Sequence, residues 1–153
     1  MRHRAMDVVR RWGAVALGSA LLTAPALAHH SYSMFQEREI KLSGTVKAFE
    51  WTNPHIFVQL LVPTAQGRIE EWSLEGSGPG DLGRKGWKFN TLKAGETIKV
   101  GVAPLKEDDR QDSGHKGGGL IFVEKADGTR LAGGPLARLD PDFHGGPGPP
   151  PEK

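Results

Sequence analysis

The amino-acid sequence predicts a small all-β domain, folded as a five-stranded Greek-key barrel. Five stretches of alternating or continuous apolar residues are separated by Gly, Pro, Asn and Asp turn residues, which is typical of short strands. No stretch carries the apolar repeat of a long amphipathic helix. We therefore expect the five main strands near 38–51, 55–62, 68–76, 96–103 and 119–125.

The first strand, within REIKLSGTVKAFEW, alternates with Ile40, Leu42, Val46 and Ala48 on its inner face. Gly44 stands inside it, where a glycine often marks a bulge or sharp bend. The aromatic residues that follow, 49 and 51, have the opposite parity, so the strand should coil or bulge near its end. After the turn signal TNP, the second strand, HIFVQLLV, is nearly all apolar, which predicts burial on both of its faces.

The third strand, RIEEWSLEG, should point Trp72 and Leu74 inward, and the glycine-rich stretch after it has room for one helical turn near 81–85. A turn at 94–95 introduces the fourth strand, and a charged loop at 107–119 introduces the fifth. Asp127-Gly128 then predicts a hairpin with a short returning strand.

This order of elements fits a barrel of the oligonucleotide/oligosaccharide-binding (OB) type, in which a compact connector lies between the third and fourth strands. Gly44 would let one long strand bend and join the two halves of such a barrel. A small β-sandwich is the alternative. Fold class by itself does not determine function.

Residues 1–28 have the pattern of a secretory signal peptide, and cleavage after Ala28 would leave His29 as the first residue of the mature protein. The apolar run is broken by glycine, serine and proline, so we expect cleavage rather than a stable membrane span. The pair Arg10-Arg11 leaves the twin-arginine export route open beside the general one. The sequence thus predicts a periplasmic or secreted protein.

Removal of the leader changes the charge of the protein. The leader contains four of the 20 Lys and Arg residues and one of the 18 acidic residues, which leaves 16 basic and 17 acidic residues. The basic pI near 9.0 is therefore largely a property of the leader, and we expect no nucleic-acid partner. There are no cysteines, so stability must come from burial of a core rather than from disulfides. We divide the mature chain into a lead-in at 29–37, a barrel domain at 38–135 and a disordered Pro- and Gly-rich tail at 136–153.

Three motifs, HHSYSMF, GTVKAFEWTNPH and GRKGW followed by LKAGETIKV, resemble those of a family of small secreted proteins of Gram-negative bacteria known only as a domain of unknown function. The resemblance spans roughly 28–133, and Trp-Thr-Asn-Pro-His at 51–55 is its most specific part. It implies an exported all-β domain and no particular activity.

A free N-terminal His29 could chelate copper through its α-amine and its ring, with His30 or His55 as a further nitrogen source. At the terminus alone, this resembles the histidine brace of copper monooxygenases and of some periplasmic copper carriers. The alternative for His29 and His30 is a solvated pair near the chain end. For His55, it is a structural hydrogen bond that fixes the Asn-Pro turn. The sequence therefore predicts copper binding as one function.

The other predicted function is a non-enzymatic binding module for a periplasmic peptide, glycan or protein partner. Trp51, Asn53 and Trp72 are its possible ligand face, although packing for the tryptophans and turn capping for Asn53 are the alternatives. The sequence has no cysteine nucleophile, nucleophile elbow or phosphate loop, so we predict no catalytic residues. A redox enzyme built on the histidine brace is the weakest of the three hypotheses.

Overall fold

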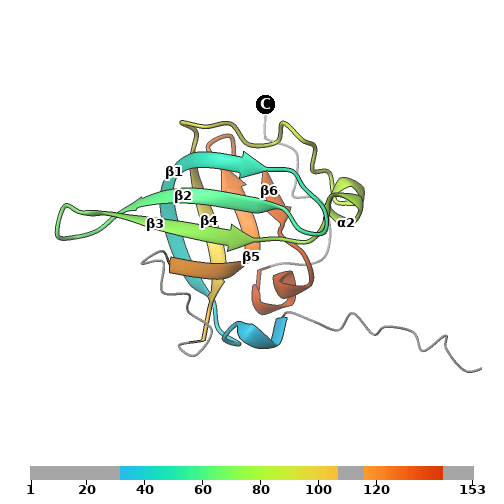
Figure 1. The fold of residues 1–153 in the computed structure, drawn as a ribbon, viewed down its shortest axis with the longest axis horizontal. Coiled ribbons are helices and arrows are strands. Elements are labelled where there is room, and N and C mark those ends of the chain that lie inside the picture. Colours follow the sequence, from blue (N-terminus) through green and yellow to red (C-terminus); the bar gives the residue numbers. More distant parts are fainter. Residues whose placement is uncertain (1–31, 107–115, 143–153) are drawn as a thin grey trace, which may run out of the picture. The chain divides into compact units, whose positions relative to one another are not determined.

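The computed structural model describes residues 32–106 and 116–142, which form an all-β fold with very little helix (Figure 1). Its elements, in chain order, are the 3₁₀ turn η1 (Tyr32–Met34), β1 (Ile40–Glu50), β2 (Phe57–Pro63), β3 (Ile69–Glu75), α2 (Pro79–Arg84), β4 (Thr97–Pro104), β5 (Lys116–Lys125), β6 (Arg130–Ala132) and η3 (Pro135–Leu139). The five predicted main strands, the short helical turn and the returning strand after Gly128 are all confirmed, with boundaries shifted by a few residues.

The strands close into a five-stranded barrel. They are hydrogen-bonded in the order β3-β2-β1-β4-β5, and a parallel pairing of β3 with β5, Trp72 to Glu75 against Lys116 to Gly119, completes the circle. With α2 between β3 and β4, this is the strand order of an OB-type barrel, as predicted. The alternative of a β-sandwich is wrong, because one strand, β1, belongs to both halves of the closed sheet.

The first strand changes partners along its length. Residues Ile40 to Thr45 pair with β4, and Thr45 to Glu50 pair with β2. A register shift between Val46 and Ala48 is the bulge expected near the strand end, and it lets Phe49 pack against the core. Gly44 itself lies two residues before Val46, where a Cβ would stand only 2.5 Å from the Leu61 carbonyl oxygen. Glycine is required there because β1 and β2 approach so closely.

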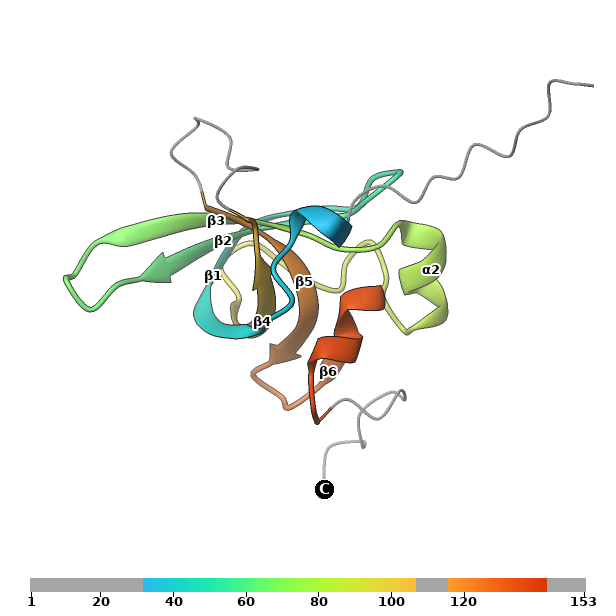
Figure 2. The same cartoon turned by 90° about the horizontal axis from the view of Figure 1, so that it is seen from below.

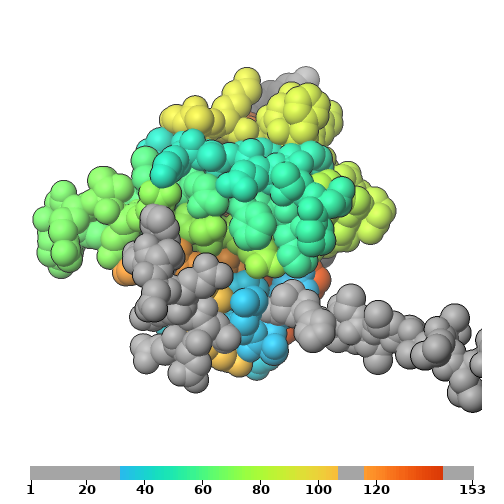
Figure 3. Space-filling model, in the orientation of Figure 1, coloured from blue at the N-terminus to red at the C-terminus, as the bar shows by residue number. Residues whose placement is uncertain are grey.

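The barrel interior is filled by one side-chain parity of each strand. In β2, Val58, Leu60 and Val62 are buried, whereas Phe57 and Gln59 are only half-buried. The prediction that β2 is buried on both faces is therefore wrong. Side chains of β1 and β2 form part of the surface in Figure 3, so the outer face of β2 remains in contact with solvent.

A second apolar cluster lies outside the barrel, on the outer face of β4 and β5. Phe35 from the lead-in and Leu136 from η3 are each 3% exposed and pack there against Ala103, Ile121 and Phe122. Figures 1 and 2 both show η1 and η3 beside β5. These two short helical turns therefore cover one end of the sheet that the strands alone would leave bare.

This second cluster corrects the predicted start of the disordered tail at residue 136. Residues 136–142 are ordered, since Leu136 and Ala137 are buried and the buried carboxylate of Asp140 is ion-paired with Arg130. The tail is rich in proline and glycine overall, but it begins with a short apolar segment, PLARL. This segment forms η3 and is long enough to cover part of the sheet. Residues 143–153 lie outside the described part of the chain, as does the predicted signal peptide.

Candidate functional site

The loop that joins β1 to β2, residues 51–56, carries the histidine that the sequence singles out. Asn53 and Pro54 are joined by a cis peptide bond, and the Thr52 hydroxyl donates a hydrogen bond to the His55 carbonyl oxygen at 3.0 Å. His55 then directs its ring toward β3, where Nδ1 lies 2.5 Å from Oε1 of Glu75. The loop therefore presents an imidazole that is held from one side by a carboxylate.

This contact determines which nitrogen of His55 is available for chemistry. A carboxylate oxygen accepts a hydrogen bond, so Nδ1 carries the proton and Nε2 keeps its lone pair whenever the ring is neutral. Nε2 has no partner among the residues that the structure describes, and the side chain is 31% exposed. Metal-binding histidines are commonly oriented in this way, with a carboxylate on the nitrogen that does not touch the metal.

Three other chain segments converge on Ser77, directly beside this histidine. The Ile56 amide donates to the Ser77 carbonyl oxygen at 3.3 Å, and the Ser77 amide donates to the Gly133 carbonyl oxygen at 2.9 Å. From the lead-in, the Tyr32 hydroxyl lies 3.4 Å from the Ser77 hydroxyl. At Gly134, a Cβ would stand 2.4 Å from the Ser77 Oγ, so glycine is needed for this close approach. The start of the described chain is thus tied to the same end of the barrel as His55.

Taken by themselves, the described residues do not make a metal site. Within 32–106 and 116–142 there is no group of three or more His, Cys, Asp or Glu side chains placed to hold a metal ion. His29 and His30, the other predicted metal ligands, lie outside these ranges. The one predicted ligand that the structure describes is therefore His55.

The three residues of the predicted ligand face differ in how far they are exposed to solvent. Trp72 is 7% exposed and belongs to the barrel core, and Lys116 lies over its ring, with Nζ 5.5 Å from the ring centroid. Trp51 is half-buried and packs on Phe49, while Asn53 is exposed at the turn. A ligand on this face would therefore contact Trp51 and Asn53. Their role in binding stays a prediction.

Sequence reasoning identified His55 but missed its partner Glu75. A usable signal was present in the β2–β3 hairpin. In this hairpin Leu60 pairs with Trp72, and Phe57 pairs with Glu75. Counting residue pairs outward from the turn at 64–67 therefore places Glu75 next to the loop 51–56 that carries His55. The contact of Tyr32 with Ser77 had no such local signal.

Comparison with known families agrees with the motifs in the sequence. Residues 18–114, well over half of the chain, match the model of a family described as "Family of unknown function (DUF6152)". The chain belongs to this family. The matched region contains the histidine pair at 29–30, the whole loop 51–56 and the first four strands. No protein with curated annotation matches the chain. In the described part of this DUF6152 protein, no helix is long and apolar enough to span a membrane.

Proposed function

We propose that this protein is exported to the periplasm, begins there at His29, and binds Cu(II) in a carrier or sensing role. The α-amine and ring of His29 would chelate the metal, and Nε2 of His55 would supply the third nitrogen, with His30 as a further donor. Nitrogen ligands in a tetragonal arrangement suit Cu(II). The single observation that supports this proposal best is the Nδ1 contact of His55 with Glu75.

The His55–Glu75 pair supports the proposal in two ways. It places the ring proton on Nδ1 and leaves Nε2 as an electron-pair donor on a partly exposed side chain. It also restricts rotation of the ring, because Glu75 lies on β3, within the hydrogen-bonded barrel.

The position of Tyr32 makes the participation of His29 sterically reasonable. Tyr32 contacts Ser77, whose carbonyl oxygen accepts a hydrogen bond from the residue that follows His55. His29 precedes Tyr32 by three residues, and three residues of chain span at most about 11 Å. A copper site that uses both histidines therefore requires residues 29–31 to lead from Tyr32 toward His55.

Processing is the first requirement of this proposal. We expect intact-mass measurement of the exported protein to show that residues 1–28 have been removed and that His29 is the N-terminus. A mature chain that begins at Ser31 or later, or one that retains the leader, would lack the free amine of His29 and would rule out the chelate.

Copper binding can be tested with matched histidine variants. We expect His55→Ala to weaken Cu(II) binding by about 100-fold, because it removes a ligand, whereas Glu75→Gln should weaken it by about tenfold, because it removes only the group that orients that ligand. His115→Ala and His144→Ala are controls that each remove one imidazole elsewhere, and we expect affinities close to that of the unchanged protein. Competition titration gives the affinities, and the nitrogen hyperfine pattern in electron paramagnetic resonance should lose one nitrogen in His55→Ala.

An added alanine before His29 tests the terminal chelate itself. The amine and the ring would then belong to different residues, so we expect weaker binding and a changed spectrum. If the added alanine changes neither, the copper proposal is wrong. The second candidate function is then a binding module for a peptide, glycan or protein, supported by the exposed Asn53 and the half-buried Trp51 on the same loop.

A further inference from the structure

The connector between α2 and β4, residues 85–96, exposes an aromatic ring to solvent. Phe89 is 74% exposed, more than Ile69 and Tyr32, the other large apolar side chains that are open to solvent in the described residues. In Figure 1 the connector runs along the top of the barrel, whereas the β2–β3 hairpin, which carries Ile69, projects to the left, and η1, which carries Tyr32, lies at the bottom. Phe89 therefore stands apart from the other exposed apolar side chains.

The turn that carries Phe89 is held in place from both sides. The Thr91 amide donates a hydrogen bond to the Lys88 carbonyl oxygen at 3.0 Å, which closes a β-turn with Phe89 at its second position. The Lys88 amide in return donates to the Thr91 hydroxyl at 2.6 Å. Trp87 and Leu92, on either side of the turn, are buried in the barrel core. The ring is therefore presented to solvent by a fixed backbone, which lowers the entropy cost of using it in binding.

The chain around Phe89 is basic. Between residues 82 and 95 it contains four cations and no acidic residue: Arg84, Lys85, Lys88 and Lys93. Lys88 and Lys93 are exposed, and their ammonium groups form no hydrogen bond or ion pair with any described residue. Arg84 and Lys85 share the single carboxylate of Asp81, so these three side chains together keep one positive charge.

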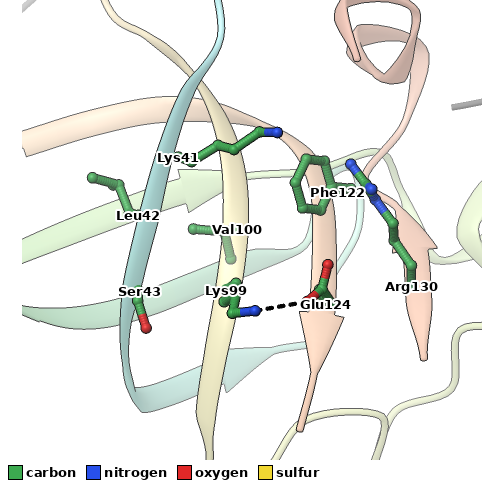
Figure 4. A pocket seen from close by; sticks show the side chains of 8 residues that line it. All are labelled: Lys41, Leu42, Ser43, Lys99, Val100, Phe122, Glu124 and Arg130. Atoms are coloured by element: carbon green, nitrogen blue, oxygen red, sulfur yellow. Dashed lines mark hydrogen bonds and ion pairs between the residues drawn. The ribbon is translucent and has the colours of Figure 1, made fainter. Parts of the chain in front are cut away.

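The neighbouring acidic residues do not neutralise this charge. Glu96 is already paired with Lys125, with 3.1 Å between Oε1 and Nζ. Cations outnumber acids here even when Asp127, the next acid along the chain from Lys125, is included. On the adjoining sheet, by contrast, Lys99 is paired with Glu124, as Figure 4 shows. The connector thus keeps an excess of positive charge, which attracts an anionic surface.

We propose that this surface, formed by Phe89, Lys88 and Lys93, docks the protein on an anionic lipid bilayer. The ring would enter the headgroup region, and the two ammonium groups would lie against lipid phosphates. A bilayer fits better than a protein partner, because one phenylalanine side chain buries only about 150–250 Å². Each side of a stable protein interface buries about 800 Å², and no other exposed large apolar side chain of the described residues lies beside Phe89.

Sedimentation with lipid vesicles tests this proposal. The exported protein is stripped of metal with EDTA, so that the outcome does not depend on the copper proposal. At about 0.15 M salt, where remote charges are screened, we expect half of it to bind vesicles of about one-third phosphatidylglycerol in phosphatidylcholine at a lipid concentration on the order of 1 mM. Vesicles of phosphatidylcholine alone should bind more than about tenfold more weakly, since they offer the lysines no net negative charge.

The contribution of the ring is measured with two matched apolar variants. Phe89→Ala should weaken binding to the anionic vesicles by about tenfold, because the ring no longer leaves water. Phe89→Trp should keep the binding, since tryptophan is also favoured at the membrane interface. Ile69→Ala is the control, because Ile69 is 61% exposed but is followed by Glu70 and Glu71, which an anionic surface repels. We expect it to bind like the unchanged protein.

The contribution of charge is measured with two variants of equal net charge. Lys88→Met should weaken binding by about fivefold, the effect of one lysine at an anionic surface. Arg68→Met removes an exposed cation in the β2–β3 hairpin and should change binding by less than about twofold. No binding at about 10 mM lipid, equal binding to neutral and anionic vesicles, or equal weakening by Phe89→Ala and Ile69→Ala would each overturn the proposal. So would self-association in solution that Phe89→Ala abolishes, because the ring would then be covered by a second copy of the chain.

Discussion

Replacing Trp87 by alanine is expected to lower the free energy of unfolding by about 3–5 kcal/mol. Trp87 is 2% exposed, and its indole Nε1 donates a hydrogen bond to the Ala132 carbonyl oxygen at 2.9 Å. Its ring also packs on Phe49, with 5.9 Å between centroids. The side chain thus joins the connector after α2 to β1 and β6, and its loss would leave both a cavity and an unpaired carbonyl group.

Urea unfolding followed by circular dichroism would measure this effect. Phe89→Ala is a matched control two residues away, because that side chain is 74% exposed and its truncation should cost less than about 0.5 kcal/mol. Trp87→Phe should lie between the two, since it keeps most of the packing but loses the hydrogen bond. A loss below about 1 kcal/mol for Trp87→Ala would show that this region is not part of the cooperative core.

Gly44→Val is the second substitution with a large expected effect, a loss of about 3 kcal/mol or more. The first atom of any side chain at this position would stand 2.5 Å from the Leu61 carbonyl oxygen and 3.0 Å from the Leu60 side chain. The carbonyl oxygen belongs to the backbone of β2 and cannot move without disturbing its pairing with β1. The barrel would then lose the strand that both of its halves share.

A helical glycine serves as the control for this substitution. At Gly80, which lies in α2, no atom of another part of the described chain lies within 4 Å of the place that a Cβ would take. We therefore expect Gly80→Ala to leave stability unchanged or to raise it by up to about 1 kcal/mol, as for alanine in a helix. Thermal unfolding of both variants gives the comparison. Equal stability of Gly44→Val and the unchanged protein would mean that β1 and β2 can separate without cost.

Much of the fold could be predicted because its signals are local. The alternation in 40–46 and the inward positions Trp72 and Leu74 follow from the two-residue period of a strand, which depends only on neighbouring residues. The turn at Gly128 is likewise local, since its positive φ is one that glycine adopts readily. The outward-facing side chains of β2 are mostly apolar, and for this reason the strand was wrongly predicted to be buried on both faces. The periodicity of a sequence does not reveal whether another element covers a given face.

The candidate site could be predicted only in part for the same reason. His55 stands out because it follows an Asn-Pro turn at the start of a strand. Its partner Glu75 comes from a different strand, and the contact depends on the register of the hairpin between them. Tyr32 reaches Ser77 across 45 positions of sequence, a contact that no short pattern encodes.

By itself, the sequence determined the strand positions, the turns, the connector and the family motifs, because each of these arises from residues that are close neighbours along the chain. Only the tertiary structure decided that Glu75 holds Nδ1 of His55, that Leu136 seals the second apolar cluster, and that the Phe122 ring packs over Gly101. These three features depend on which strands pair and in what register. The free energy that selects this pairing comes from burial in the whole core rather than from any one segment.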